Sequence, residues 1–109
     1  MIDVEINHNE AGQTIGFIVK NHGKTHVCAA VSMLVINTVN SIEALTDLGM
    51  LGFKCNHEES GGFIEFSLNN QTSRDIGAGL LLDAMVLGLQ SVAEQHPNEI
   101  SIIKQEVSQ

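Results

Sequence analysis

The sequence of 109 residues contains no Trp or Tyr, only four Phe and only five Lys and Arg. Direct binding to nucleic acid depends on clustered cations for the phosphates and on aromatic rings for stacked bases. This chain is poor in both. Its 13 acidic residues against five basic ones give a formal net charge of -8, which favours encounter with a basic partner. We therefore expect no direct binding to nucleic acid.

Signals for membrane insertion, secretion and metal binding are also missing from the sequence. No run approaches the roughly 18 consecutive apolar residues of a membrane span, and the segment Met1–Glu5 lacks the basic and then apolar order of a signal peptide. Cys28 and Cys55 are not spaced as a CxxC pair, and the five His residues form no HExxH motif. We expect a cytoplasmic protein with free thiols, no membrane span, no metal and no cofactor.

The apolar residues that are present suffice for one domain spanning residues 1–109. They make up 43% of the chain, and a chain of this length buries roughly two thirds of its unfolded surface. Ile2, Val4 and Ile6 alternate with polar residues, as in a half-buried strand, and a turn at 9–12 leads to a second strand over about residues 13–20.

A long helix is predicted from Cys28 to about Thr46, with Thr25 as its N-cap. Apolar positions recur there at spacings of three and four, and they are Val31, Leu34, Val35, Thr38, Val39, Ile42 and Leu45. Two short strands follow, over about residues 51–56 and 63–68, joined through a turn that contains Gly61 and Gly62.

A second helix is predicted to run to about Gln95, with Thr72 or Ser73 as its N-cap, and a last strand to cover residues 100–107. Its expected apolar face consists of Ile76, Leu80, Ala84, Leu87 and Val92. The order ββαββαβ predicts an α+β fold of two layers, in which both helices cover one face of a mainly antiparallel sheet.

Histidines and a thiol come together between residues 20 and 32, where a polar loop leads into the first helix. A cysteine in the first turn of a helix lies near free amides and the positive end of the helix dipole, which favour the thiolate. His22 is close enough in sequence to act as its base, and the same amides offer an oxyanion hole. A single Cys in an apolar helix is more often a small buried side chain. Spacing alone therefore leaves both interpretations open.

Two short motifs favour the chemical interpretation. Asn-His-Gly at 21–23 and Val-Cys-Ala-Ala-Val-Ser at 27–32 resemble the Gly-His-Ala and Cys-Ala-x-x-Ser signature of the ribosomal-processing cysteine proteases. The likeness extends over the whole chain, from the first hairpin to the last strand. It implies a cytoplasmic peptide hydrolase, with His22 as general base and Cys28 as nucleophile.

The same resemblance implies a substrate and an assembly. Members of that family remove the N-terminal extension from the precursor of ribosomal protein L27 during maturation of the large subunit, and they tend to be homodimers. A basic ribosomal protein suits the negative charge of this chain. The five residues between His22 and Cys28 form a shorter loop than in many members.

Further residues near the motif are candidates for supporting roles. Ser32, one helical turn beyond Cys28, is a candidate for orienting the thiolate or the substrate, and equally for a hydroxyl that bonds back to an upstream carbonyl. Gly23 and Ala29, next to the motif His and Cys, are candidates for binding or orienting the substrate. His26 is a second candidate base, although the motif matches His22.

Two other functions stay open. Because the loop is short, the alternative is a module that binds the immature ribosomal protein, or regulates ribosome assembly, without cutting it. A redox-sensing thiol at Cys28 is a third hypothesis. Cys55, on a predicted strand, is expected to be a half-buried packing residue.

Overall fold

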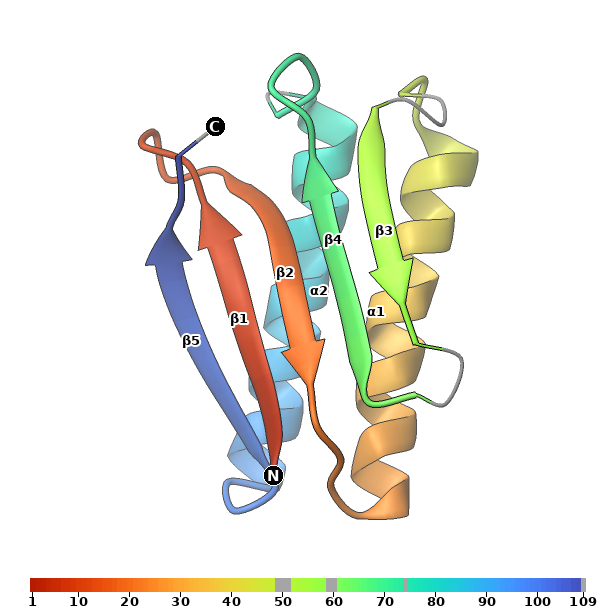
Figure 1. Cartoon of the computed structure of the whole chain (residues 1–109), viewed down its shortest axis with the longest axis vertical. Helices are drawn as coiled ribbons and strands as arrows, with labels where there is room; N and C mark the ends of the chain where they lie inside the picture. Colours follow the sequence, from red (N-terminus) through yellow and green to blue (C-terminus); the bar gives the residue numbers. More distant parts are fainter. Residues whose placement is uncertain (49–51, 59–60, 74, 109) are drawn as a thin grey trace.

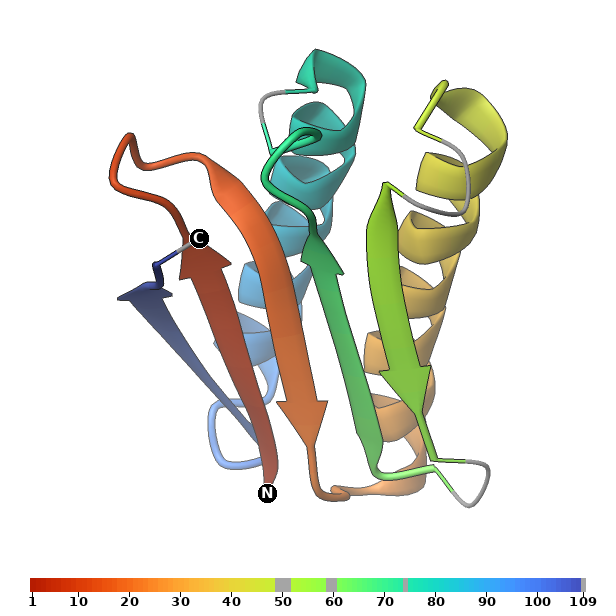
Figure 2. The same cartoon turned by 45° about the horizontal axis from the view of Figure 1, so that its top comes forward.

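The computed structural model describes residues 1–48, 52–58, 61–73 and 75–108. One five-stranded sheet, in the order β3-β4-β2-β1-β5, carries both helices on the same face (Figures 1 and 2). The elements are β1 (Ile2–His8), β2 (Thr14–Lys20), α1 (Thr25–Leu45), β3 (Phe53–His57), β4 (Phe63–Leu68), α2 (Ile76–Gln95) and β5 (Ile100–Glu106). The predicted α+β class and the order ββαββαβ are confirmed. The predicted start of β3 at Leu51 lies outside the described residues.

Pairing within the sheet is antiparallel except at one edge. The strand β1 pairs with β2, β2 with β4, and β4 with β3 in antiparallel register. β5 instead runs parallel to β1, with Ile100 opposite Ile2. This parallel pairing brings the turn before β5 to the start of β1, so the end of α2 and the N-terminus lie close together (Figure 1).

The core lies between the sheet and the two helices. Alternate residues of β1 point into it, as the sequence predicted, and Phe17 of β2 stacks on Phe66 of β4 with ring centroids 5.5 Å apart. Helix α1 contributes the buried residues Val27, Val31, Val35, Thr38, Val39 and Ile42. Leu45, which was predicted to belong to the apolar face of α1, is 74% exposed because it is the last residue of the helix.

Both predicted N-caps are wrong. Helix α1 begins at Thr25 itself, and its N-cap is Lys24, which makes no side-chain capping bond. Helix α2 is capped by Asp75, whose carboxylate accepts from the amide of Ala78 at 2.8 Å. Thr72 and Ser73 do not cap the helix because α2 begins only at Ile76, and both residues lie in the turn before its N-cap. Their hydroxyls donate to carbonyl oxygens of that turn and of Gly52.

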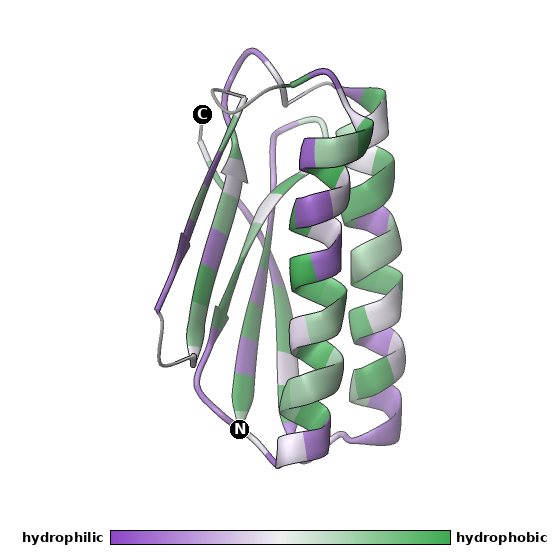
Figure 3. Cartoon of the chain, turned by 90° about the vertical axis from the view of Figure 1, so that its right-hand side faces the viewer, coloured by the Kyte–Doolittle hydropathy of each residue, from purple (hydrophilic) through white to green (hydrophobic). Residues whose placement is uncertain are grey.

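The predicted apolar face of α2 is also wrong. Ile76, Leu80 and Leu87 are 88%, 69% and 67% exposed, whereas the helix buries Ala78, Leu82, Met85, Val86 and Leu89. The physical reason is that α2 is apolar around most of its circumference, so its periodicity does not select one face. Figure 3 shows apolar residues along both helices. The exposed stripe is a surface feature that the fold of one chain leaves uncovered.

The expectation that no segment is long and apolar enough for a membrane span needs correction. By length and composition alone, both α1 and α2 meet that criterion. Both helices nevertheless pack one face on the sheet, and core helices of folded proteins share the same length and composition. This property is weak evidence for a membrane role.

Candidate active site

The loop that carries the candidate base is residues 21–24, between β2 and α1. Asn21 has a φ of 71°, and it is the only residue other than glycine with positive φ in the described part of the chain. Asn tolerates this left-handed conformation better than most residues. Its amide donates to the carbonyl of Gly62 at 2.8 Å, and its side chain donates to the carboxylate of Asp3 at 2.6 Å. The loop therefore turns sharply after β2 and places His22 beside the glycine turn that precedes β4.

The imidazole of His22 lies directly against Gly61 and Gly62. A Cβ placed on Gly62 would be 2.5 Å from Nε2, and one placed on Gly61 would be 3.7 Å from Cε1. Both glycines have positive φ, 80° and 85°, so they suit the turn and leave room for the ring. The predicted role of this glycine pair in the turn is confirmed; Glu59 and Ser60 of the same turn lie outside the described residues.

The candidate nucleophile Cys28 lies in the first turn of α1 and is half-buried. Its Sγ accepts from the amide of Gly23 at 3.1 Å and lies 3.4 Å from the carbonyl oxygen of Gly23, to which a thiol can donate. A thiolate can accept but not donate, so it would keep only the hydrogen bond from the amide of Gly23. Cys28 also lies at the start of a helix, where the dipole favours negative charge. The amides of Val27 and Cys28 already donate to the carbonyl of Lys24.

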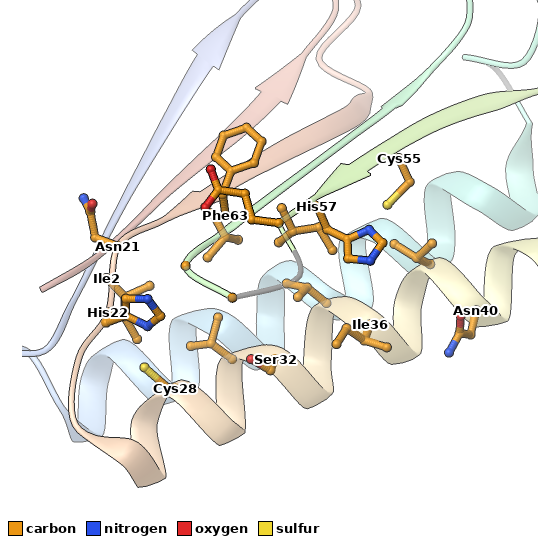
Figure 4. A pocket seen from close by; sticks show the side chains of 18 residues that line it. Ile2, Asn21, His22, Cys28, Ser32, Ile36, Asn40, Cys55, His57 and Phe63 are labelled. Carbon is orange, nitrogen blue, oxygen red and sulfur yellow. The ribbon is translucent and has the colours of Figure 1, made fainter.

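His22 and Cys28 open onto the same groove, between α1 and the β3–β4 hairpin. Its volume is about 500 Å³, and Figure 4 shows both side chains at one end with Asn40 and Cys55 at the other. Much of the lining is apolar, including Val31, Val35, Ile36, Val39, Phe63 and Ile64. A mainly apolar groove of this volume, with a thiol at one end, is large enough to bind a short segment of a substrate.

The other predicted site residues divide into two groups. Ser32 is exposed and lines the groove, and Gly23 touches the sulfur through its backbone. His26 and Ala29 are not among the groove residues. The ring of His26 instead meets that of His96 edge-on, with centroids 5.2 Å apart. The structure thus brings His22, rather than His26, to the side of the helix on which Cys28 opens.

Cys55 belongs to the groove as well. It is half-buried, and desolvation by burial raises the pKa of its thiol. The sequence predicted that Cys55 is a packing residue but did not predict that it lines the groove. Cys55 and His57 are two residues apart on β3, so their side chains lie on the same face of the sheet, and both line the groove. Within the described residues, no group of three or more His, Cys, Asp or Glu side chains is placed to hold a metal ion.

A loop histidine and a helix-start cysteine that share one groove are typical of thiol-dependent hydrolases. Comparison with known proteins identifies the group within this class. The family model described as cysteine protease Prp matches residues 1–101, so the chain belongs to this family and is a cysteine protease. The family resemblance and the enzyme class inferred from the sequence are confirmed.

Relatives and solved structures agree with this assignment. The ribosomal processing cysteine protease Prp of Staphylococcus aureus is 28% identical over 108 residues, covering 94% of this chain and 97% of that protein. Its structure with a covalently linked product peptide matches with a TM-score of 0.87 at 27% identity, over 96% of this chain and 100% of that one. Its complex with a substrate peptide matches with a TM-score of 0.85 at 25% identity, with the same coverage.

Proposed function

We propose that this protein hydrolyses a peptide bond through a thioester on Cys28, with His22 as the base. His22 takes the thiol proton, and the sulfur attacks the scissile carbonyl carbon. When the C–N bond breaks, the proton passes from His22 to the leaving amine. His22 then takes a proton from water, whose oxygen displaces the sulfur and releases the carboxylic acid and the thiol.

The observation that carries this proposal is the contact between Cys28 and Gly23. An amide 3.1 Å from the sulfur stabilises the thiolate before attack. It also lies close to where the carbonyl oxygen of a substrate bonded to that sulfur becomes negatively charged. Because the amides of Val27 and Cys28 already donate to Lys24, we assign the main oxyanion donor to the loop amide of Gly23.

The proposed substrate is the N-terminal extension of the precursor of ribosomal protein L27. Three observations support it: the relatives are named ribosomal processing proteases, a groove of about 500 Å³ opens beside Cys28, and the net charge of -8 favours encounter with a basic protein. Because the proposed substrate is a ribosomal protein, we propose that the enzyme acts in the cytoplasm.

The experiment that tests this function is incubation of the purified protein with the full-length precursor. The wild-type protein should shorten the precursor from its N-terminus, and Cys28→Ala and His22→Ala should leave it intact, as read from the product masses. If the precursor stays intact but binds tightly to the wild-type protein, the non-cleaving binding module becomes the better description.

We further propose that the protein acts as a homodimer that buries the exposed stripe of α2, namely Ile76, Leu80 and Leu87. These side chains are at least 67% exposed in one chain. A two-fold axis brings the same stripe of both chains together, so an apolar surface meets its own copy without any need for charge complementarity. Two-fold homodimers are the commonest closed assemblies.

A further inference from the structure

Glu99 is far from the His22–Cys28 loop in sequence but touches it in space. It lies in the turn between α2 and β5, where its amide donates to the carbonyl of His96 at 3.0 Å and its carbonyl accepts from Ile2 at 2.8 Å. Its side chain is 22% exposed. The backbone of Glu99 is therefore held by the end of α2 and by β1, independently of the loop.

The carboxylate of Glu99 contacts Lys24 in two ways. One oxygen accepts from the backbone amide of Lys24 at 3.2 Å, and the other lies 3.8 Å from its Nζ. Lys24 is the N-cap of α1, makes no side-chain capping bond, and is followed by no acidic residue in the first turn. Glu99 thus supplies the acceptor that the start of a helix ordinarily takes from its own residues.

This contact is one peptide plane away from the sulfur of Cys28. The amide of Lys24 and the carbonyl of Gly23 belong to the same planar peptide group. That carbonyl lies 3.4 Å from Sγ, and the amide of Gly23 lies 3.1 Å from it. A Cβ on Gly23 would be only 3.2 Å from the nearer oxygen of Glu99. Gly23 is therefore enclosed between the carboxylate and the sulfur.

We propose that Glu99 is a positioning residue for the active site, which holds the Gly23–Lys24 peptide so that Gly23 keeps its contacts with the sulfur of Cys28. It acts through the loop, because its side chain contacts Lys24 and its backbone contacts His96 and Ile2. The inference rests on the proposed role of Cys28 as nucleophile. It explains how the short loop of residues 21–24 is held although Lys24 makes no side-chain capping bond.

The first test is the rate at which iodoacetamide alkylates Cys28 at pH 6, without substrate, measured on the peptide that contains this residue. Glu99→Ala removes the acceptor for the amide of Lys24, so the Gly23–Lys24 peptide is held less firmly and Gly23 keeps its contact with the sulfur for less of the time. Alkylation of Cys28 should therefore slow about threefold. Glu99→Gln removes the same charge but keeps a carbonyl acceptor, and should stay within about twofold of wild type.

The second test is turnover of the precursor peptide by the same variants. Glu99→Ala should lower kcat about tenfold with KM within about twofold, because the lost contact stabilises the reacting sulfur rather than bound substrate. Lys24→Ala keeps the backbone amide and removes only an exposed ion pair, so it should behave as wild type. Glu94→Ala, at an exposed carboxylate of α2, is the matched control.

Four results would overturn the inference. If Glu99→Ala has the same alkylation rate and kcat as Glu94→Ala, Glu99 does not position the active site. Glu99→Gln as slow as Glu99→Ala assigns the effect to charge, and Lys24→Ala as slow as Glu99→Ala assigns it to the ion pair. Alkylation of Cys55, followed in the same samples, should not change; if it accelerates, the variant loosens the whole fold. Should wild type cleave nothing, the proposed function fails, but the alkylation series still decides the role of Glu99.

Discussion

The imidazole of His22 rests on the backbone of Gly62, so close that a Cβ at that position would lie 2.5 Å from Nε2. The amide of Asn21 also donates to the carbonyl of Gly62. The turn before β4 therefore packs against the proposed base and positions it, although His22 and Gly62 are far apart in sequence. Any side chain at position 62 must move the ring.

Gly62→Ala should lower precursor cleavage about 100-fold, because displacement of a catalytic group by about 1 Å costs on that order. The added Cβ also meets a φ of 85°, which costs roughly 1–2 kcal/mol of stability. Gly12→Ala is the matched control, since Gly12 has a φ of 82° but its Cβ would meet nothing within 4 Å. Kinetics and chemical denaturation of both variants separate the two effects. Equal activity of the two variants would show that His22 is not held by this turn.

Cys55 should react with iodoacetamide more slowly than free cysteine at pH 8. Burial raises the pKa of its thiol, so less thiolate is present at a given pH. Since the folded state holds this proton more tightly than the unfolded state, the corresponding stability is present below the unfolded pKa of about 8.5 and is lost as pH rises above it. Cys28, with the amide of Gly23 on its sulfur, should react faster than Cys55 at mildly acidic pH. Faster reaction of Cys55 would place the nucleophile in β3.

Asp75→Ala should lower the free energy of unfolding by about 1 kcal/mol, the usual cost of losing an N-cap. The carboxylate of Asp75 accepts from Ala78 at 2.8 Å. Thr25→Ala provides the comparison, because Thr25 is exposed and α1 has no side-chain cap. Urea denaturation should show a loss for the first variant and little change for the second. The opposite order would mean that Thr25 caps α1 after all.

Leu80→Glu should convert the proposed dimer to monomer, because it places a charge in the middle of the exposed stripe of α2 in both chains. Sedimentation at several concentrations measures the change in mass. Ile103→Glu, at a residue of β5 that is 51% exposed, is the control and should keep the wild-type mass. A wild-type protein that sediments as a monomer would rule out the dimer, and a dimer unaffected by Leu80→Glu would rule out this surface.

Periodicity predicted the elements well where one face alone is apolar. Ile2, Val4 and Ile6 alternate with polar residues, and they are buried as expected. Helix α2 is apolar on several faces, so the buried side depends on the sheet beneath it and cannot be inferred from the helix alone. The predicted N-caps were wrong because sequence patterns locate a helix end only to within a few residues. Helix α2 begins at Ile76, and Thr72 lies in the preceding turn, where its hydroxyl donates to the carbonyl of Asn69.

The site was predictable only in its local part. His22 and Cys28 are close in sequence and carry a recognisable motif, whereas Gly62, Cys55 and Glu99 reach the site through strand pairing and the turn before β5. No pattern around Glu99 distinguishes it from the other acidic residues. Such contacts depend on tertiary structure, which sequence patterns report only indirectly.

The most direct test of the central claim is to locate the acyl group during turnover. The enzyme is mixed with excess substrate, quenched in acid within the first turnover, digested and mapped by mass spectrometry. The mechanism predicts a thioester of the N-terminal product on Cys28, none on Cys55, and none anywhere in Cys28→Ala. An acyl group on another residue, or cleavage that persists in Cys28→Ala, would contradict it.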